Sequence, residues 1–134
     1  MPSTLTSTGI TFSDGTSQNT AAGGDASKAW LSYNGDTATV RDSFNVSSIT
    51  DNNVGDYTTN LTSSMANSSY AVSGAISAAG SVNSNVNIFQ IHSSAANTLA
   101  APSTSAFRAM SIHDANDVKQ DVDYFTVIVH GDAA

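Results

Sequence analysis

The side chains best suited to binding a transition metal are the three histidines. His92, His113 and His130 each stand at or near the end of a predicted strand. Imidazoles from three chains could meet on a symmetry axis and ligate a metal ion there. The sequence contains no His-x-His pair, and ordinary strand-end histidines are the alternative. The expectation is therefore that the chain holds no metal and no other cofactor.

Two acidic segments carry the oxygen ligands that calcium prefers. One is Asp-Asn-Asn-Val-Gly-Asp at positions 51–56, and the other contains Asp114, Asn116 and Asp117. Neither has the loop spacing or the terminal glutamate of the helix–loop–helix calcium site. We favour the other interpretation, in which each segment is a polar β-turn.

The residue types define no catalytic constellation. The chain has no cysteine, so a thiol nucleophile is excluded. Serine is so frequent that a Ser–His–Asp triad could be drawn arbitrarily, and the geometry that such a triad requires does not follow from spacing. No glycine-rich segment opens a predicted helix that could hold a phosphate. We expect that the protein is not an enzyme.

The aromatic side chains are the remaining candidates for ligand binding. Tyr33, Tyr57 and Tyr70 could stack on sugar rings, as rigid amphipathic side chains do at binding sites. Trp30 and Tyr124 could do the same, although the position of Trp30 at a strand start favours the core or its rim. The alternative for all of them is that they fill the core of a small β-domain.

Net charge argues against nucleic acid as a partner, and the length of the apolar segments argues against insertion into a membrane. The chain carries four basic residues against eleven acidic ones, for a net charge of −7. A phosphate-tracking groove needs several cations on one face, so no nucleic-acid binding is expected. No segment approaches the roughly 20 apolar residues of a membrane span, so no membrane insertion is expected. Charged residues make up only 11% of the chain, so hydroxyl and amide side chains should cover its solvated faces.

The elements that must position these residues are strands. From Lys28 onward, apolar residues recur at nearly every second position between Gly, Asn and Asp turns, which predicts antiparallel sheet buried on one face. We expect an all-β domain at 28–134, an antiparallel β-sandwich of about seven or eight strands. One strand should run from about Thr37 to Ser48, with a bulge or bend around Arg41 to Ser43. The most apolar strand, which ends at His130, should be central in its sheet. The expected core residues near the start of the domain are Val40, Phe44, Val46 and Ile49.

Residues 1–27 form a different unit. Asp14-Gly15 lies between alternating residues, which predicts a β-hairpin with a tight turn. Ile10 and Phe12 would share one face of this hairpin. Because a lone hairpin is marginal in water, these two side chains should serve attachment or oligomerisation. Residues 21–27, Ala-Ala-Gly-Gly-Asp-Ala-Ser, should connect this arm flexibly to the sandwich.

Seven short segments follow one another in a characteristic order and spacing: Lys28-Ala29-Trp30, Tyr33-Asn34-Gly35, Arg41 to Asn52, Gly55-Asp56-Tyr57, Tyr70 to Gly74, Phe107-Arg108 and the final Val-Ile-Val strand. In this order and spacing they resemble a module at the C-terminal ends of bacteriophage tail-fibre-like virion proteins. The hairpin resembles the Ile-x-Phe-x-Asp-Gly-Thr-x-Gln element that precedes such modules. The resemblance implies a virion structural protein, assembled as a homotrimer with other phage virion proteins. It also implies contact with the host through a cell-surface glycan or protein.

The resemblance does not specify a position on the particle or assign a role to any residue. The sequence shows no long fibre shaft, so a short fibre is the leading expectation. A head fibre or a capsid decoration protein is the alternative within the virion. A carbohydrate-binding module is the alternative of a different functional class.

Overall fold

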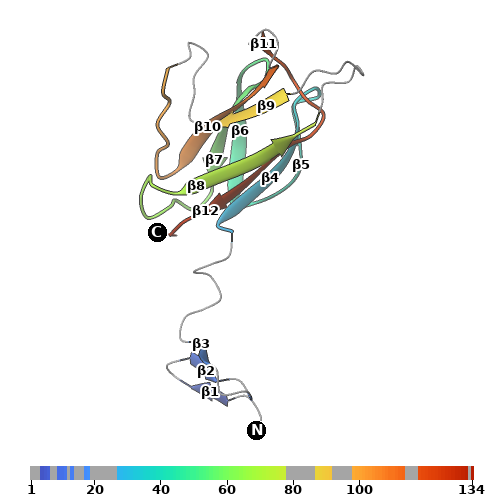
Figure 1. Ribbon diagram of the computed structural model, residues 1–134. Helices are drawn as coiled ribbons and strands as arrows, with labels where there is room; N and C mark the ends of the chain where they lie inside the picture. The colour runs from blue at the N-terminus through green and yellow to red at the C-terminus, as the bar shows by residue number, and fades with distance from the viewer. Residues whose placement is uncertain are drawn as a thin grey trace.

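The structure is a computed structural model, which describes residues 4–6, 9–11, 13, 17–18, 27–77, 87–91, 98–113, 118–132 and 134. Within these residues the chain is all-β and contains no helix (Figure 1). The strands are β1 (Thr4–Thr6), β2 (Gly9–Thr11), β3 (Ser17–Gln18), β4 (Ala29–Asn34), β5 (Thr39–Phe44), β6 (Val46–Asn53), β7 (Asp56–Leu61), β8 (Ala71–Ile76), β9 (Asn87–Ile91), β10 (Ala106–His113), β11 (Val118–Lys119) and β12 (Phe125–His130).

The N-terminal strands form a small antiparallel sheet of their own. Strand β2 pairs with β3, where Ile10 lies opposite Gln18, as expected for the predicted hairpin. Strand β1 pairs with the other side of β2 and places Leu5 opposite Ile10, which makes the sheet three-stranded. Strand β1 was not predicted from the sequence. Phe12 lies outside the described residues.

The first sheet of the main domain has the order β5-β4-β12-β8, and all its pairings are antiparallel. Strand β12 lies between β4 and β8, so the prediction that the most apolar strand is central is confirmed. Strands β5 and β8 are the sheet edges. Gly74 on β8 faces inward, where an added Cβ would collide with the ring of Phe89 and with the Thr126 carbonyl oxygen.

The second sheet has five strands. Strand β10 pairs with β9 along one side and with β7 and then β11 along the other, and β6 completes the sheet beyond β7. The two-residue strand β11 was not predicted, because its residues follow a turn-like segment and are not apolar in alternation. Hydroxyl and amide groups cover part of this sheet, since the Asn60 amide donates to Ser48 Oγ at 3.1 Å and to Thr50 Oγ1 at 3.2 Å.

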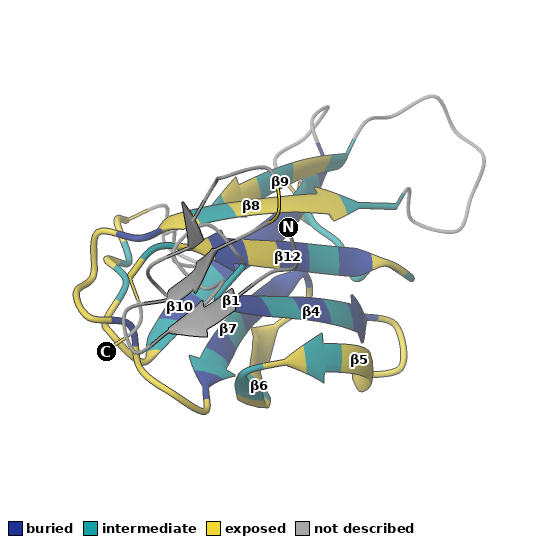
Figure 2. Ribbon diagram, turned by 90° about the horizontal axis from the view of Figure 1, so that it is seen from below, coloured by how far each residue is buried: buried dark blue, intermediate teal, exposed yellow. Residues whose placement is uncertain are grey.

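The two sheets pack face to face as a β-sandwich, as predicted. Burial alternates along β4 and β12 (Figure 2), and the buried residues of both strands belong to the core between the sheets. Tyr57 is fully buried at the centre, with its ring centroid 5.0 Å from those of both Tyr33 and Phe125 in edge-to-face geometry. Such pairs add to the stabilisation that area burial supplies. Among the described residues the core consists of Ala29, Leu31, Tyr33, Tyr57, Leu61, Met65, Tyr70, Phe107, Ala109, Val122, Phe125, Val127 and Val129.

The segment predicted as one strand from Thr37 to Ser48 is two strands in different sheets. Asn45 separates β5 from β6 and has a φ of 55°, which Asn tolerates better than most residues. Its side-chain amide donates to the Lys28 carbonyl at 2.9 Å and accepts from the Ser63 backbone N–H at 2.7 Å. Asn45 therefore fixes the point at which the chain crosses between the layers.

Two of the four expected core residues near the start of the domain are exposed instead. Val40 and Phe44 lie on the edge strand β5, where 42% and 54% of their surface remains accessible. Val46 and Ile49, on the other side of the crossing, pack against the core as expected. The predicted bulge is present, because Ser32 pairs with Asp42 and Tyr33 with Val40, which leaves Arg41 as the extra residue.

Candidate functional site

The three tyrosines considered for ligand stacking lie in the core. Tyr33 and Tyr57 are buried between the sheets, and Tyr70 is buried beside Phe107. The Tyr70 hydroxyl donates to the carbonyl oxygens of Ser103 and Ala106 at 2.8 and 3.1 Å. These rings have no free face for a sugar, so the core alternative is correct for all three. Burial raises the pKa of Tyr70 to about 12.

Gly55 and Tyr57 are anchored by one carboxylate. Asp121 Oδ1 accepts hydrogen bonds from the Tyr57 hydroxyl at 2.5 Å and from the Gly55 backbone N–H at 2.7 Å. Burial, and then the hydrogen bond and charge of Asp121, raise the pKa of Tyr57 far above its ordinary value. Gly35 lies against the Tyr57 hydroxyl, where a Cβ would collide. These residues tie two turns to the segment that leads into β12.

Asp56 is the centre of an ion pair on the five-stranded sheet. Its side chain is fully buried and accepts bidentate hydrogen bonds from Arg108 at 2.7 and 2.8 Å, with Lys119 Nζ at 3.4 Å. Burial alone would raise the pKa of Asp56, but the hydrogen bonds and charges of Arg108 and Lys119 outweigh it and hold the pKa below its ordinary value. Both oxygens are occupied, which supports the turn interpretation of residues 51–56 over the calcium loop.

A second cluster lies at the edge of the four-stranded sheet. The Arg41 guanidinium pairs with the Asp123 carboxylate at 2.6 Å and stands 4.0 Å from the centroid of the Tyr124 ring. It also donates to the Asp123 carbonyl oxygen. The Asn34 amide donates to the same carboxylate at 2.8 Å. The bulge at Arg41 thus turns this side chain toward the start of β12 and fastens the sheet edge.

The described histidines do not converge. His113 is buried at the end of β10 and His130 is exposed at the end of β12, in different sheets. No group of three or more His, Cys, Asp or Glu residues in the described part of the chain could hold a metal ion. His92, Asp114, Asn116 and Asp117 lie outside the described residues.

A run of exposed and half-buried side chains lies on the side of the four-stranded sheet that faces away from the core, here called the outer face. Strand register places two rows across it. In the first row Phe44, Trp30, Ile128 and Ser73 lie side by side, and in the next row Asp42, Ser32, Thr126 and Ala75 do so. Phe44 is 54% exposed, Ile128 is 45% exposed and Trp30 is half-buried.

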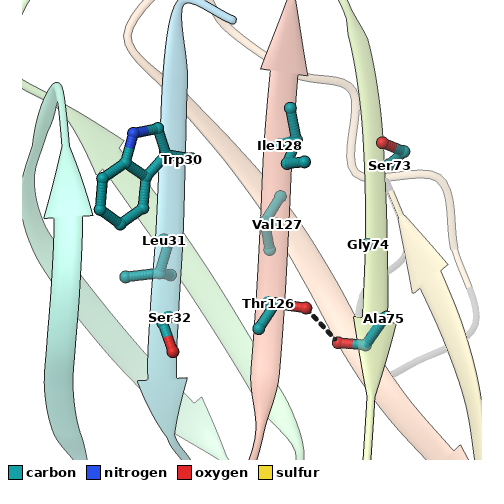
Figure 3. Close-up of a pocket in the computed structure, with 9 residues that line it drawn as sticks. All are labelled: Trp30, Leu31, Ser32, Ser73, Gly74, Ala75, Thr126, Val127 and Ile128. Carbon is teal, nitrogen blue, oxygen red and sulfur yellow. Dashed lines mark hydrogen bonds between the residues drawn. The ribbon is translucent and has the colours of Figure 1, made fainter.

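The outer face is hollowed between these two rows. A shallow pocket of about 380 Å³ is lined by Trp30 and Ser32 from β4, Thr126 and Ile128 from β12, and Ser73 and Ala75 from β8 (Figure 3). We call it the Trp30 hollow. It exists because the side chains of Ser32, Ser73 and Ala75 are short, while Trp30 and Ile128 stand above the sheet.

The polar groups of the Trp30 hollow are hydroxyls and one indole N–H. The Thr126 hydroxyl donates to the Ala75 carbonyl at 2.9 Å, which leaves its oxygen able to accept. The hydroxyls of Ser32 and Ser73 make no hydrogen bond within the described residues, and no charged side chain lines the hollow. The arrangement can therefore hold an uncharged ligand through one aromatic face and several hydrogen bonds.

Most of this site was not predicted from the sequence. Trp30 was expected in the core or at its rim, and Phe44 was expected in the core. The alternation in β4 does contain the signal, since Ala29, Leu31 and Tyr33 share one face and Trp30 must take the other. In β12 the run of five residues from Phe125 to Val129 is almost wholly apolar, so it gives no such indication for Ile128.

Comparison of the chain with protein-family models, with curated proteins and with solved structures finds no match. The described part of the chain contains no helix long and apolar enough to cross a membrane.

Proposed function

We propose that the chain is a non-enzymatic bacteriophage virion structural protein of the short, tail-fibre-like type. In this proposal the N-terminal sheet serves assembly into a homotrimer and attachment to other virion proteins. The β-sandwich is the displayed domain, and the outer face of its four-stranded sheet contacts the host cell surface. The observation that carries the assignment of the contact surface is the row formed on that face by the exposed Phe44 and Ile128 and the half-buried Trp30 between them.

The structural roles of the motif residues support this proposal. Asn45 fixes the crossing between sheets, Gly55 and Tyr57 share the Asp121 carboxylate, and Asp56 is held by Arg108. These residues build turns, crossings and core contacts. The matching segments also contain Trp30, Phe44 and Ile128, so the resemblance in sequence covers the framework and the proposed contact row alike.

The exposed surface supplies a second argument. Contiguous exposed apolar side chains on a soluble domain mark interaction sites more often than isolated ones do. Phe44 and Ile128 flank Trp30 directly in the strand register. On the five-stranded sheet, by contrast, hydroxyl and amide groups bond to one another around Asn60. Ile88 on β9 of that sheet is exposed as well, so the assignment of the contact surface rests on the way Phe44, Trp30 and Ile128 adjoin on the outer face.

The proposal is tested by asking whether the chain is present in the phage particle. Phage particles encoded by the same genome would be purified on a density gradient, and their proteins quantified by mass spectrometry. The proposal predicts that each particle contains several copies of the chain. It also predicts that an antibody label directed against the chain is seen at the tail. A label over the head would favour the capsid decoration alternative. Absence of the chain from intact particles would contradict the proposal.

Assembly is tested separately by the mass of the purified protein in solution. The expected mass is that of three chains, and Ile10→Asp in β2 should shift the population to monomer by placing a charge in the arm. Asp36→Asn, a change in an exposed turn of the sandwich, is the control and should leave the trimer intact. A wild-type protein that is strictly monomeric at micromolar concentration would contradict the trimer.

A further inference from the structure

We propose that the Trp30 hollow is a binding site for a neutral saccharide, in which one sugar ring stacks on Trp30. This inference rests on the proposed function and names the chemistry of the host-surface contact. Its starting point is the composition of the hollow. One aromatic side chain stands at its rim, short side chains form its floor, and hydroxyl groups are spaced across it (Figure 3).

The indole ring supplies the apolar part of the recognition. Trp30 is half-buried and lines the hollow, so part of its ring remains accessible to a ligand. A rigid aromatic ring loses little conformational entropy when a ligand stacks on it. The less polar face of a pyranose ring, which carries axial C–H groups, is the natural partner for such a surface.

The hydroxyl groups supply the polar part. Ser32 and Ser73 lie on opposite sides of β12, and neither hydroxyl has a hydrogen-bond partner within the described residues. Thr126 stands between them in the register, adjacent to both strands, with its donor used on Ala75 and its oxygen free to accept. A ligand that both donates and accepts at several points around a ring would pair with all three, which a purely apolar ligand would not.

The lack of charged side chains in the lining of the hollow favours an uncharged sugar. None of its lining residues is charged, and the carboxylate nearest in the register is Asp42, opposite Ser32 on β5. Arg41, the basic residue closest along that strand, is already paired with Asp123 and Tyr124. An acidic sugar would lose hydration without gaining a cation and would meet the field of Asp42.

Size limits the ligand to a short saccharide unit. The volume of about 380 Å³ is at the small end of the range of ligand pockets, about 300–1,000 Å³. The hollow is shallow, so the remainder of a longer glycan would continue over the outer face. Weak affinity per site is expected, because few side chains enclose the ligand, and display of several copies would compensate for it.

Trp30 is the only tryptophan of the chain, which makes its fluorescence a reporter of this one site. The full-length protein would be titrated with lactose, cellobiose, maltose and N,N′-diacetylchitobiose, and separately with 3′-sialyllactose. The proposal predicts a saturable change with at least one neutral disaccharide. It also predicts a response to 3′-sialyllactose weaker than that to any neutral sugar that binds. No saturable response to any neutral sugar, or preference for the acidic one, would overturn the proposal.

Two substitutions on one strand provide the matched variants. Ala75 and Ala71 both lie exposed on the outward side of β8, four residues apart, but only Ala75 lines the hollow. Ala75→Leu should fill the hollow and weaken binding at least about tenfold. Ala71→Leu should leave binding unchanged, and both variants should keep the wild-type melting temperature. Equal effects of the two substitutions on binding would overturn the assignment of the site.

The outcomes separate this inference from the proposed function. A chain that is found in virions and binds host cells, yet gives no response to the neutral sugars, would contradict the saccharide site alone. A chain that binds a neutral sugar through Ala75-sensitive contacts but is absent from particles would contradict the virion role alone. In that case the carbohydrate-binding module would be the correct alternative.

Discussion

Trp30 on β4 lies directly opposite Ile128 on β12, and both side chains point away from the core of the sandwich. Their neighbours in the same strands, Leu31 and Val127, are also opposite each other and are buried. Adjacent residues on each of these strands therefore lie on opposite sides of the sheet, one in the core and the next on the outer face.

This alternation predicts losses of stability of different size for adjacent substitutions in β12. Val127→Ala should lower the free energy of unfolding by about 2 kcal/mol, because it removes buried methyl groups and leaves a cavity. Ile128→Ala should cost less than about 1 kcal/mol, since 45% of that side chain is already exposed. Urea denaturation of the two variants measures both values. Similar losses for the two would show that the outer face is covered.

Removal of the ion pair of Asp56 should lower the stability of the fold by an amount that depends on pH. Asp56→Asn should destabilise the fold by about 2 kcal/mol at pH 7, less than the ~3–5 kcal/mol of a fully buried pair, because water still reaches the two cations. The pKa of Asp56 is lower in the folded state, so its stabilisation is complete above the ordinary carboxyl pKa of about 3.9 and disappears as the pH falls through the folded value. Denaturation at pH 7 and in acid tests this. The difference between wild type and variant should shrink in acid, and Asp36→Asn in an exposed turn should be neutral at both.

Deprotonation of the Tyr70 hydroxyl should lower the stability of the fold in alkali. The pKa of this phenol is about 12 in the fold and about 10 in the unfolded chain, so the folded state binds more protons between these values. Stability should therefore be constant below about pH 10 and fall as the pH rises toward 12. Tyr70→Phe should cost about 1 kcal/mol at pH 7, through the lost hydrogen bonds to Ser103 and Ala106. Its stability should fall less steeply in alkali than that of the wild type, and an equally steep fall would contradict this role of Tyr70.

Replacement of the Thr59 side chain by an apolar one should stabilise the protein. Its hydroxyl oxygen is buried and has no hydrogen-bond partner within the described residues. Thr59→Val keeps the shape of the side chain and replaces the unpaired hydroxyl by a methyl group, so the free energy of unfolding should rise by about 1 kcal/mol. Thr126→Val is the control, because it removes a hydroxyl that is bonded to Ala75. A lower melting temperature for Thr59→Val would indicate that its hydroxyl has a partner.

Much of the fold could be predicted because alternation is a local property. Tyr57, Thr59 and Leu61 stand at every second position of the sequence, and all three are buried on β7. Alternation does not specify the sheet to which a strand belongs. The crossing at Asn45 depends on a positive φ and on contacts with Lys28 and Ser63. For that reason Val40 and Phe44 were assigned to the core, whereas their place on an edge strand exposes them.

The site could be predicted less well than the fold, because it depends on register between distant segments. Trp30 and Ser73 are separated by more than forty positions in the sequence, and only the pairing of β4, β12 and β8 brings them to one hollow. The same holds for Asp56 and Arg108, which are 52 residues apart. The tyrosines were plausible binding residues by type, but their position inside the sandwich is decided by strand phase.

The most direct test of the proposed contact surface is the binding of the labelled, full-length protein to cells of the phage host. The matched variants are Ile128→Ser on the outer face and Ile88→Ser on β9 of the other sheet, where the isoleucines are 45% and 50% exposed. The account predicts saturable binding by the wild type and the Ile88→Ser variant, and a loss of at least about tenfold for Ile128→Ser. Absence of wild-type binding, or equal binding by both variants, would contradict the claim that the outer face meets the host.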